Sequence, residues 1–144
     1  MSGAIVWLLV GVASLGCVTR QPNGLSAAAL LELPASFAGE LPCTSCSGIR
    51  TELDLRANGT WFLRSTYLGR GDDARHEAMG SFTLASDSDR LVLWGAAEPP
   101  RVFRVVDEDT LRMLDPKGGE IGSTLDYELR REEPYRMRKI FAAE

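Results

Sequence analysis

Two cysteines spaced three positions apart, Cys43 and Cys46, are the residues whose type and spacing best suit chemistry. In an oxidising compartment they can form a disulfide, which would stiffen only a local loop. As thiolates they suit monovalent copper or zinc, although zinc normally takes two further ligands and the chain has no second CxxC. Redox exchange, as a sensor or an oxidoreductase, is a third alternative, and plain packing of the loop is a fourth. Oxidoreductase chemistry is the least favoured, because Ser47-Gly48 leads into a predicted strand and not into a helix that would lower a thiol pKa.

Three other side chains could donate a soft ligand. His76 could complete a copper site with the two thiols, but it lies in the polar stretch Gly69–Glu77, which we expect to be a solvated loop. The thioethers of Met79 and Met113 sit in apolar strand patterns, which favours positions in the core. Copper therefore remains a ligand that Cys43 and Cys46 could bind.

The acidic residues are expected to face solvent. Glu52 and Asp54 share the polar face of a predicted strand, so a paired-carboxylate hydrolase is not predicted. Asp72, Asp73 and Glu77 could bind a hard cation, but a solvated acidic loop explains them. The single histidine makes a Ser-His-Asp site hard to assemble. We therefore predict no catalytic residues and a protein that is not an enzyme.

A third cysteine, Cys17, ends an apolar leader. Met1–Thr19 carries no charged side chain, and Ala4–Leu15 is an apolar run of about a dozen residues, shorter than the ~20 that span a bilayer. Such a run is typical of a secretory signal, and a plain signal peptide or an uncleaved anchor is the alternative to a lipoprotein signal. Ser14-Leu15-Gly16-Cys17 resembles the lipobox of bacterial lipoproteins, which implies cleavage before Cys17 and its acylation. Acyl chains would then anchor the protein to a membrane. In lipoproteins that this leader resembles, an Asp after the acylated cysteine favours the inner membrane, so the resemblance with Val18 at that position implies the outer membrane.

The elements that must position Cys43 and Cys46 are predicted to be short strands. Ile49–Arg56 alternates apolar and charged residues, which is typical of a half-buried strand. Asn58-Gly59 is a strong hairpin turn, and Thr60–Leu68 is rich in aromatic and β-branched residues suited to the return strand. Further strands are predicted at Ala78–Leu84, Arg90–Trp94, Arg101–Val106, Thr110–Leu114 and Leu125–Arg130.

Many short strands separated by turns predict an all-β domain, a small antiparallel barrel or sandwich. The predicted organisation is a signal peptide over residues 1–16, an acylated tether over 17–34, the β-domain over 35–130 and a weakly ordered tail over 131–144. Leu25–Leu33 could form a short helix or remain a loose spacer. Six aromatic side chains could build the core or line a small apolar pocket: Trp61, Phe62, Tyr67, Phe82, Trp94 and Phe103.

The composition fits one globular domain that does not bind nucleic acid. The chain has 144 residues, 44% of them hydrophobic and 25% charged, and a formal net charge of −4. A nucleic-acid binder needs an excess of Lys and Arg to neutralise phosphates, so an acidic balance argues against that class.

The run LPASFAGELPCTSCSGI, residues 33–49, resembles the NlpE N-terminal domain family of copper resistance or homeostasis lipoproteins. Later pieces agree in order, namely Leu53-Asp54-Leu55 with Asn58-Gly59-Thr60, Tyr67–Arg70, Leu91–Leu93, Thr110–Asp115 and Leu125–Leu129. The resemblance covers most of the chain after the leader. The sequence stops near Glu144, without the second, OB-type domain of the full-length family member.

The resemblance implies a lipocalin-like β-barrel on an outer-membrane lipoprotein that faces the periplasm. It also implies a link to envelope-stress signalling, surface sensing and copper tolerance, with an envelope-stress sensor protein as a partner. By matching position, Cys43 and Cys46 are the family's CxxC pair and Cys17 is its acylated cysteine. The alternative function is that of a lipocalin-like carrier or scavenger of a small apolar ligand.

Overall fold

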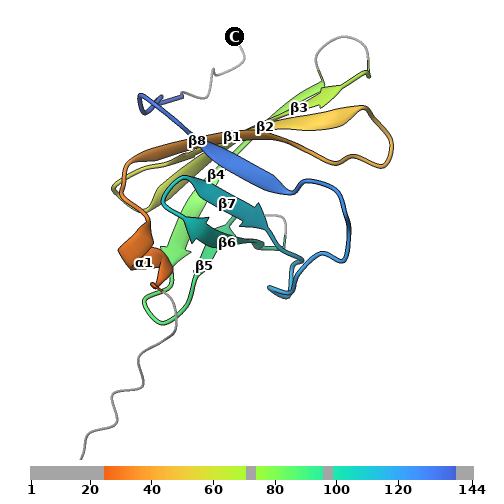
Figure 1. Cartoon of the computed structure of the whole chain (residues 1–144). Coiled ribbons are helices and arrows are strands. Elements are labelled where there is room, and N and C mark those ends of the chain that lie inside the picture. The colour runs from red at the N-terminus through yellow and green to blue at the C-terminus, as the bar shows by residue number, and fades with distance from the viewer. Residues whose placement is uncertain (1–24, 71–73, 96–98, 139–144) are drawn as a thin grey trace, which may run out of the picture.

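The computed structural model describes residues 25–70, 74–95 and 99–138, which form one short helix and eight strands (Figure 1). The helix is α1 (Ala27–Leu30). The strands are β1 (Ala35–Leu41), β2 (Gly48–Leu55), β3 (Thr60–Leu68), β4 (Ala74–Leu84), β5 (Arg90–Trp94), β6 (Arg101–Asp107), β7 (Thr110–Met113) and β8 (Glu128–Glu132).

The eight strands close into an antiparallel barrel. Each strand pairs with the next along the chain, and β8 returns to pair with β1. Closure leaves no unpaired sheet edge that could template aggregation. The predicted all-β antiparallel barrel is therefore confirmed, and the alternative of a sandwich is not observed.

The hairpin of β2 and β3 follows the local sequence closely. Gly59 has a φ of 85°, and the side-chain oxygen of Asn58 accepts a hydrogen bond from the Thr60 N–H at 3.1 Å. The turn fixes the register that places Leu53 opposite Leu63, and both side chains point into the core. The predicted hairpin is confirmed.

Strand β4 begins earlier than its apolar pattern indicated. Gly69–Glu77 is predicted as a polar loop, but the structure starts the strand at Ala74, so His76 and Glu77 lie in the ladder. The reason is pairing, because the long strand β3 needs a partner along its whole length. Glu77 is stabilised there by Arg64, which lies directly opposite it on β3.

Apolar side chains fill the interior of the barrel. Buried members of this core, each 8% exposed or less, include Phe37, Leu53, Leu55, Trp61, Leu63, Leu91, Leu93, Phe103, Val105, Leu111 and Leu129. Met113 and Phe82 pack against them as partly buried neighbours. The core position predicted for Met79 is wrong, because its side chain is 51% exposed. Trp94, predicted to build the core or line an apolar pocket, is also on the surface and is 49% exposed.

The chain before β1 packs on the barrel from residue 27. Ser26 caps α1 by accepting a hydrogen bond from the Ala29 N–H at 3.3 Å, and the Ala27 N–H donates to the Ser88 carbonyl at 2.8 Å. Ala27 and Leu31 are buried in the core. This part of the predicted tether is therefore a helical plug and not a loose spacer, while residues 1–24 lie outside the described residues.

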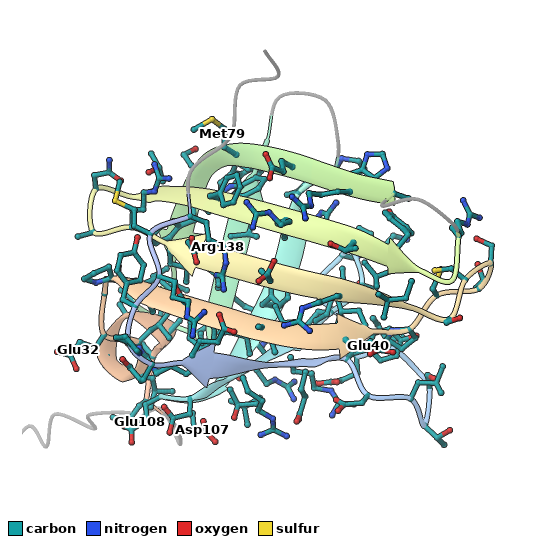
Figure 2. The ribbon with its side chains drawn as sticks, turned by 90° about the horizontal axis from the view of Figure 1, so that it is seen from above. Glu32, Glu40, Met79, Asp107, Glu108 and Arg138 are labelled. Carbon is teal, nitrogen blue, oxygen red and sulfur yellow. A yellow bond between two sulfur atoms is a disulfide. The ribbon has the colours of Figure 1, made fainter. Side chains whose placement is uncertain are left out.

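The chain after residue 130 is also part of the domain. Strand β8 runs to Glu132, and residues 133–138, here called the strap, continue across the outer face of the barrel. Figure 2 shows Arg138 lying over the sheet. The predicted weakly ordered tail is wrong up to Arg138, because contacts far away in sequence hold it; residues 139–144 lie outside the described residues.

Candidate functional site

The Cys43 and Cys46 side chains are joined in a disulfide within the loop that connects β1 to β2. The S–S distance is 2.06 Å and the two Cα atoms lie 5.4 Å apart. Both cysteines are half-buried, while Thr44 and Ser45 between them are exposed. Of the alternatives open for the pair, the structure therefore contains the disulfide, in a loop that solvent reaches.

The end of β3 holds this loop in place. The Ser47 N–H donates to the Leu68 carbonyl at 3.0 Å. Arg70 donates to Ser45 twice, from Nη2 to the hydroxyl at 2.6 Å and from Nε to the carbonyl at 3.3 Å. The sequence pattern did not indicate Arg70, because its partner lies 25 residues earlier in the chain.

A glycine permits the close approach of the two loops. Gly69 has a φ of 76°, a conformation that residues with a side chain rarely adopt. A Cβ atom there would lie 2.4 Å from the Ser47 hydroxyl. Gly69 therefore lets the β3 end pack directly against the disulfide loop.

The structure does not gather further metal ligands around the disulfide. Within residues 25–70, 74–95 and 99–138, no three His, Cys, Asp or Glu side chains lie together as a candidate metal site. His76 lies exposed on β4, opposite Ser65, with its ring edge-on to Tyr67 at 5.4 Å between centroids. Asp72 and Asp73 lie outside the described residues. A copper ion would thus rely on Cys43 and Cys46 after their reduction.

A second polar site, which the sequence did not indicate, lies under the strap. Asp54 is fully buried, although Glu52 and Asp54 are both predicted to be exposed. Its carboxylate accepts hydrogen bonds from the Ser36 hydroxyl at 2.8 Å, the Arg138 N–H at 2.8 Å and Arg138 Nη1 at 2.6 Å. The sequence pattern places Asp54 on the correct, polar face of β2, but the strap covers this face and buries the carboxylate.

The guanidinium of Arg138 is shared among three carboxylates. Besides Asp54 it contacts Glu132 and, at 3.3 Å, Glu52. Burial alone would lower the pKa of Arg138, but the hydrogen bond that Arg138 donates to Glu132 and the charges of Asp54 and Glu52 outweigh burial and raise it. Arg138 therefore stays charged and ties the strap to β2 and β8.

A groove with a polar rim lies at the opposite end of the barrel from the disulfide loop. Its volume is about 560 Å³, and Arg131 in its lining forms an ion pair with Asp109 at 3.3 Å. Its other lining residues are Ala28, Ala29, Leu30, Leu31, Glu32, Glu108 and Glu133. Figure 2 shows Glu32 and Glu108 at this end, away from Glu40. Since apolar side chains fill the described interior, this structure does not favour a carrier of an apolar ligand.

Cys17 and the predicted signal peptide lie outside the described residues. Within residues 25–70, 74–95 and 99–138, the one helix, α1, has four residues, far fewer than a membrane span requires.

Comparisons with known proteins agree with the fold. The sequence model of the NlpE N-terminal domain matches residues 37–124. Lipoprotein NlpE of Escherichia coli (strain K12) is 38% identical over 119 residues, which cover 80% of this chain and 50% of that protein.

Two crystal structures are similar to the barrel. A Shewanella oneidensis protein described as a lipoprotein superposes with a TM-score of 0.63 at 33% identity, over 76% of this chain and 96% of that one. The Cpx pathway activator NlpE from Escherichia coli superposes with a TM-score of 0.55 at 31% identity, over 78% of this chain and 52% of that one.

The chain thus spans about half the length of the Escherichia coli relative, and nearly the whole of the Shewanella protein. The relatives are lipoproteins and one is a pathway activator; none is described as an enzyme. Because the family match covers more than half of the sequence and includes both cysteines of the disulfide, the chain belongs to the NlpE N-terminal domain family.

Proposed function

We propose that the chain is a non-enzymatic outer-membrane lipoprotein domain that faces the periplasm and reports envelope stress, surface contact and copper through Cys43 and Cys46. The observation that carries the proposal is the disulfide in a solvent-accessible loop, in a chain of the NlpE N-terminal domain family. The description of the Escherichia coli relative as a Cpx pathway activator supports an envelope-stress sensor protein as the partner.

The pair can act as a two-state site because its oxidised and reduced forms differ in chemistry. A dithiol reductant delivers two electrons, the S–S bond breaks, and the reductant leaves as its own disulfide. The freed thiols lose protons to become thiolates, which are soft ligands for monovalent copper. The disulfide offers no thiolate, so copper binding and oxidation exclude each other.

Free-thiol labelling of the protein in intact cells tests the redox part of the proposal. We expect the Cys43–Cys46 disulfide in unstressed cells and a larger labelled fraction under envelope stress or copper. Cys43→Ser provides the reference for complete loss of the disulfide. A pair that stays fully oxidised under both treatments would contradict the proposed role.

Titration of the reduced domain with monovalent copper tests the metal part. The reduced protein is expected to bind one copper ion, and Cys43→Ser and Cys46→Ser should each abolish tight binding. His76→Ala is the matched control, because His76 is exposed and its ring lies against Tyr67 and not, among the described residues, against either cysteine. Equal binding by the reduced protein and Cys43→Ser would remove copper from the proposal.

Signalling is tested with a reporter of the Cpx response in cells that express the chain. We expect the response to rise with the unaltered chain and to change when Cys43 and Cys46 are both replaced by serine. If the double variant and the unaltered chain give the same response under every stress, the pair is not the reporting site.

The lipid anchor is tested by mass analysis of the mature protein from the envelope. Cleavage before Cys17 and added acyl mass are expected, and Cys17→Ser should leave the protein unacylated. Several acyl chains, at ~0.8 kcal/mol per buried methylene, are needed for stable attachment. Recovery of full-length, unacylated protein from the outer-membrane fraction would contradict the anchor.

A further inference from the structure

We propose that Arg70 is a positioning residue for the disulfide loop and stabilises the thiolate form of Cys43 and Cys46 once the pair is reduced. The inference rests on the proposed role of the pair and deepens it, because it names a residue that sets how readily the disulfide is reduced.

Arg70 is fixed to the cysteine loop itself and not to its flanks. Ser45 stands between the two cysteines and directly precedes Cys46. Its hydroxyl and its carbonyl each accept a hydrogen bond from the same guanidinium, at 2.6 Å and 3.3 Å. Two contacts from one planar group fix its orientation as well as its position.

The loop is expected to keep this arrangement after reduction. The contacts that hold it to β3 use the Ser47 N–H, the Leu68 carbonyl and both polar groups of Ser45, and none of them uses a sulfur atom. Breaking the S–S bond therefore removes no hydrogen bond between the loop and β3. The new thiolate would form in a loop whose Ser45 already holds the Arg70 guanidinium.

Glu40, Arg50 and His76 are further titratable side chains at this end of the barrel, while Asp72 and Asp73 lie outside the described residues. Glu40 on β1 and Arg50 on β2 occupy opposite register positions and carry opposite charges. His76 on β4 lies against Tyr67. Across residues 25–70, 74–95 and 99–138, no carboxylate forms an ion pair with Arg70. The guanidinium is thus the cation attached directly to the cysteine loop.

Glu40 supplies a charge of the opposite sign near the same loop. Its carboxylate lies against Gly48, since a Cβ atom built on Gly48 would be 2.3 Å from Oε1 of Glu40. The carbonyl of Gly48 lies 3.3 Å from Sγ of Cys46. A carboxylate near a thiolate disfavours it, so Arg70 and Glu40 should shift the redox equilibrium in opposite directions.

A cation beside the reduced pair shifts its redox equilibrium toward the dithiol form. When a dithiol reduces the pair, two electrons enter, the S–S bond breaks, and a nearby cation lowers the pKa of the thiol that ionises. Stabilising the thiolate favours the reduced form, so the disulfide becomes easier to reduce. A residue that merely clamped the oxidised loop would have the opposite effect.

The equilibrium with dithiothreitol, measured on the full chain, tests the sign. We expect Arg70→Gln to change the equilibrium constant about three- to tenfold in favour of the disulfide. For a two-electron couple this corresponds to a change of about 14 to 30 mV in the reduction potential. The titration of the thiolate, followed by its ultraviolet absorbance, should move to higher pH. Arg70→Lys keeps the charge and should retain most of the effect, and Glu40→Gln should shift the equilibrium toward the dithiol.

Several outcomes would overturn the proposal. They are an unchanged equilibrium in Arg70→Gln, a shift toward the dithiol, or equal shifts in Arg70→Gln and Arg70→Lys. Arg70 and Ser45 are exposed, and an unchanged circular dichroism spectrum verifies that the variants fold. These results are separable from the proposed function, because the labelling of cells asks whether the pair is reduced at all, whatever Arg70 contributes.

Discussion

Nη1 of Arg138 lies 2.6 Å from Oδ1 of Asp54, and this contact joins residues that are 84 positions apart in the sequence. Asp54 is fully buried, and it also accepts the backbone N–H of Arg138 at 2.8 Å. The Arg138 carbonyl in turn accepts a hydrogen bond from Arg56 at 3.1 Å. The strap is thereby fixed to β2 through both its backbone and its last described side chain.

Replacing Arg138 with methionine should destabilise the domain, because Asp54 would keep its burial but lose its counter-charge. The Ser36 hydroxyl and the backbone N–H of residue 138 would still bind the carboxylate, so we expect a loss of about 2–3 kcal/mol in the free energy of unfolding. Urea unfolding of the purified chain measures this loss.

Arg136→Met is the matched control for that experiment. Arg136 lies on the same strap and is exposed, and its recorded contacts to Ser36 use only backbone atoms. Its replacement should change the free energy of unfolding by no more than about 0.5 kcal/mol. If the two variants lose the same free energy of unfolding, any arginine on the strap contributes equally, and the ion pair with buried Asp54 is not the cause.

Local patterns explain which parts of the fold could be predicted. Asn58-Gly59 specifies the β2–β3 hairpin within a few residues, and Cys43 and Cys46 are close enough in sequence for their pairing to be an obvious alternative. The start of β4 was missed because His76 and Glu77 look like loop residues until the ladder with β3 is known.

Contacts between distant segments explain what could not be predicted. The alternation in β2 placed Asp54 on the polar face, which is correct, but nothing local indicates that Arg138 covers that face. In the same way, Arg70 belongs to the disulfide loop only because β3 ends beside it. The strap site depends on barrel closure, which brings β8 beside β1, and the Arg70 contact depends on the register that places the end of β3 beside the start of β2.

Gly80 is expected to tolerate no side chain. A Cβ atom there would lie 2.0 Å from the Trp94 carbonyl and 3.0 Å from the indole nitrogen of Trp61. That nitrogen donates to the Ser81 carbonyl at 2.9 Å and to the Trp94 carbonyl at 3.1 Å, so the strands cannot separate freely. We expect Gly80→Ala to reduce the free energy of unfolding by at least about 2 kcal/mol.

Thermal or urea unfolding measures the effect of Gly80→Ala, and Gly122→Ala is its control. A Cβ atom on Gly122 would meet nothing within 4 Å. That variant should unfold like the unaltered chain. A Gly80→Ala protein as stable as Gly122→Ala would mean that β4 and β5 lie further apart than the structure has them.

Reducing the disulfide should leave the barrel folded. The bridge joins residues separated by three positions, so it closes only a very small loop in the unfolded chain and contributes about 2 kcal/mol or less. The core does not depend on the bridge, because its members come from the strands. Circular dichroism with and without reductant measures this, and the Cys43→Ser/Cys46→Ser variant should show no response to reductant. Unfolding of the barrel on reduction would contradict a structural change that is confined to the disulfide loop.

The turn around Asp115 should make stability depend on pH at the acidic end. Its carboxylate accepts the Gly119 N–H at 2.9 Å and the Lys117 N–H at 2.8 Å, and the hydrogen bond from Gly119 is the main cause of a pKa below the ordinary 3.8. A carboxyl group whose pKa is lower in the folded state stabilises the protein at any pH above the pKa of the unfolded state. That stability is lost as the pH falls through the pKa of the folded state.

Asp115→Asn isolates this effect, since an amide oxygen can still accept both hydrogen bonds but carries no charge. At neutral pH the unaltered chain should have the higher Tm, and the difference should shrink toward zero as the pH falls well below 3.8, where the native carboxyl is also neutral. Calorimetry across this range measures both proteins. A difference that stays constant or grows on acidification would mean that the ionised carboxylate does not stabilise the turn.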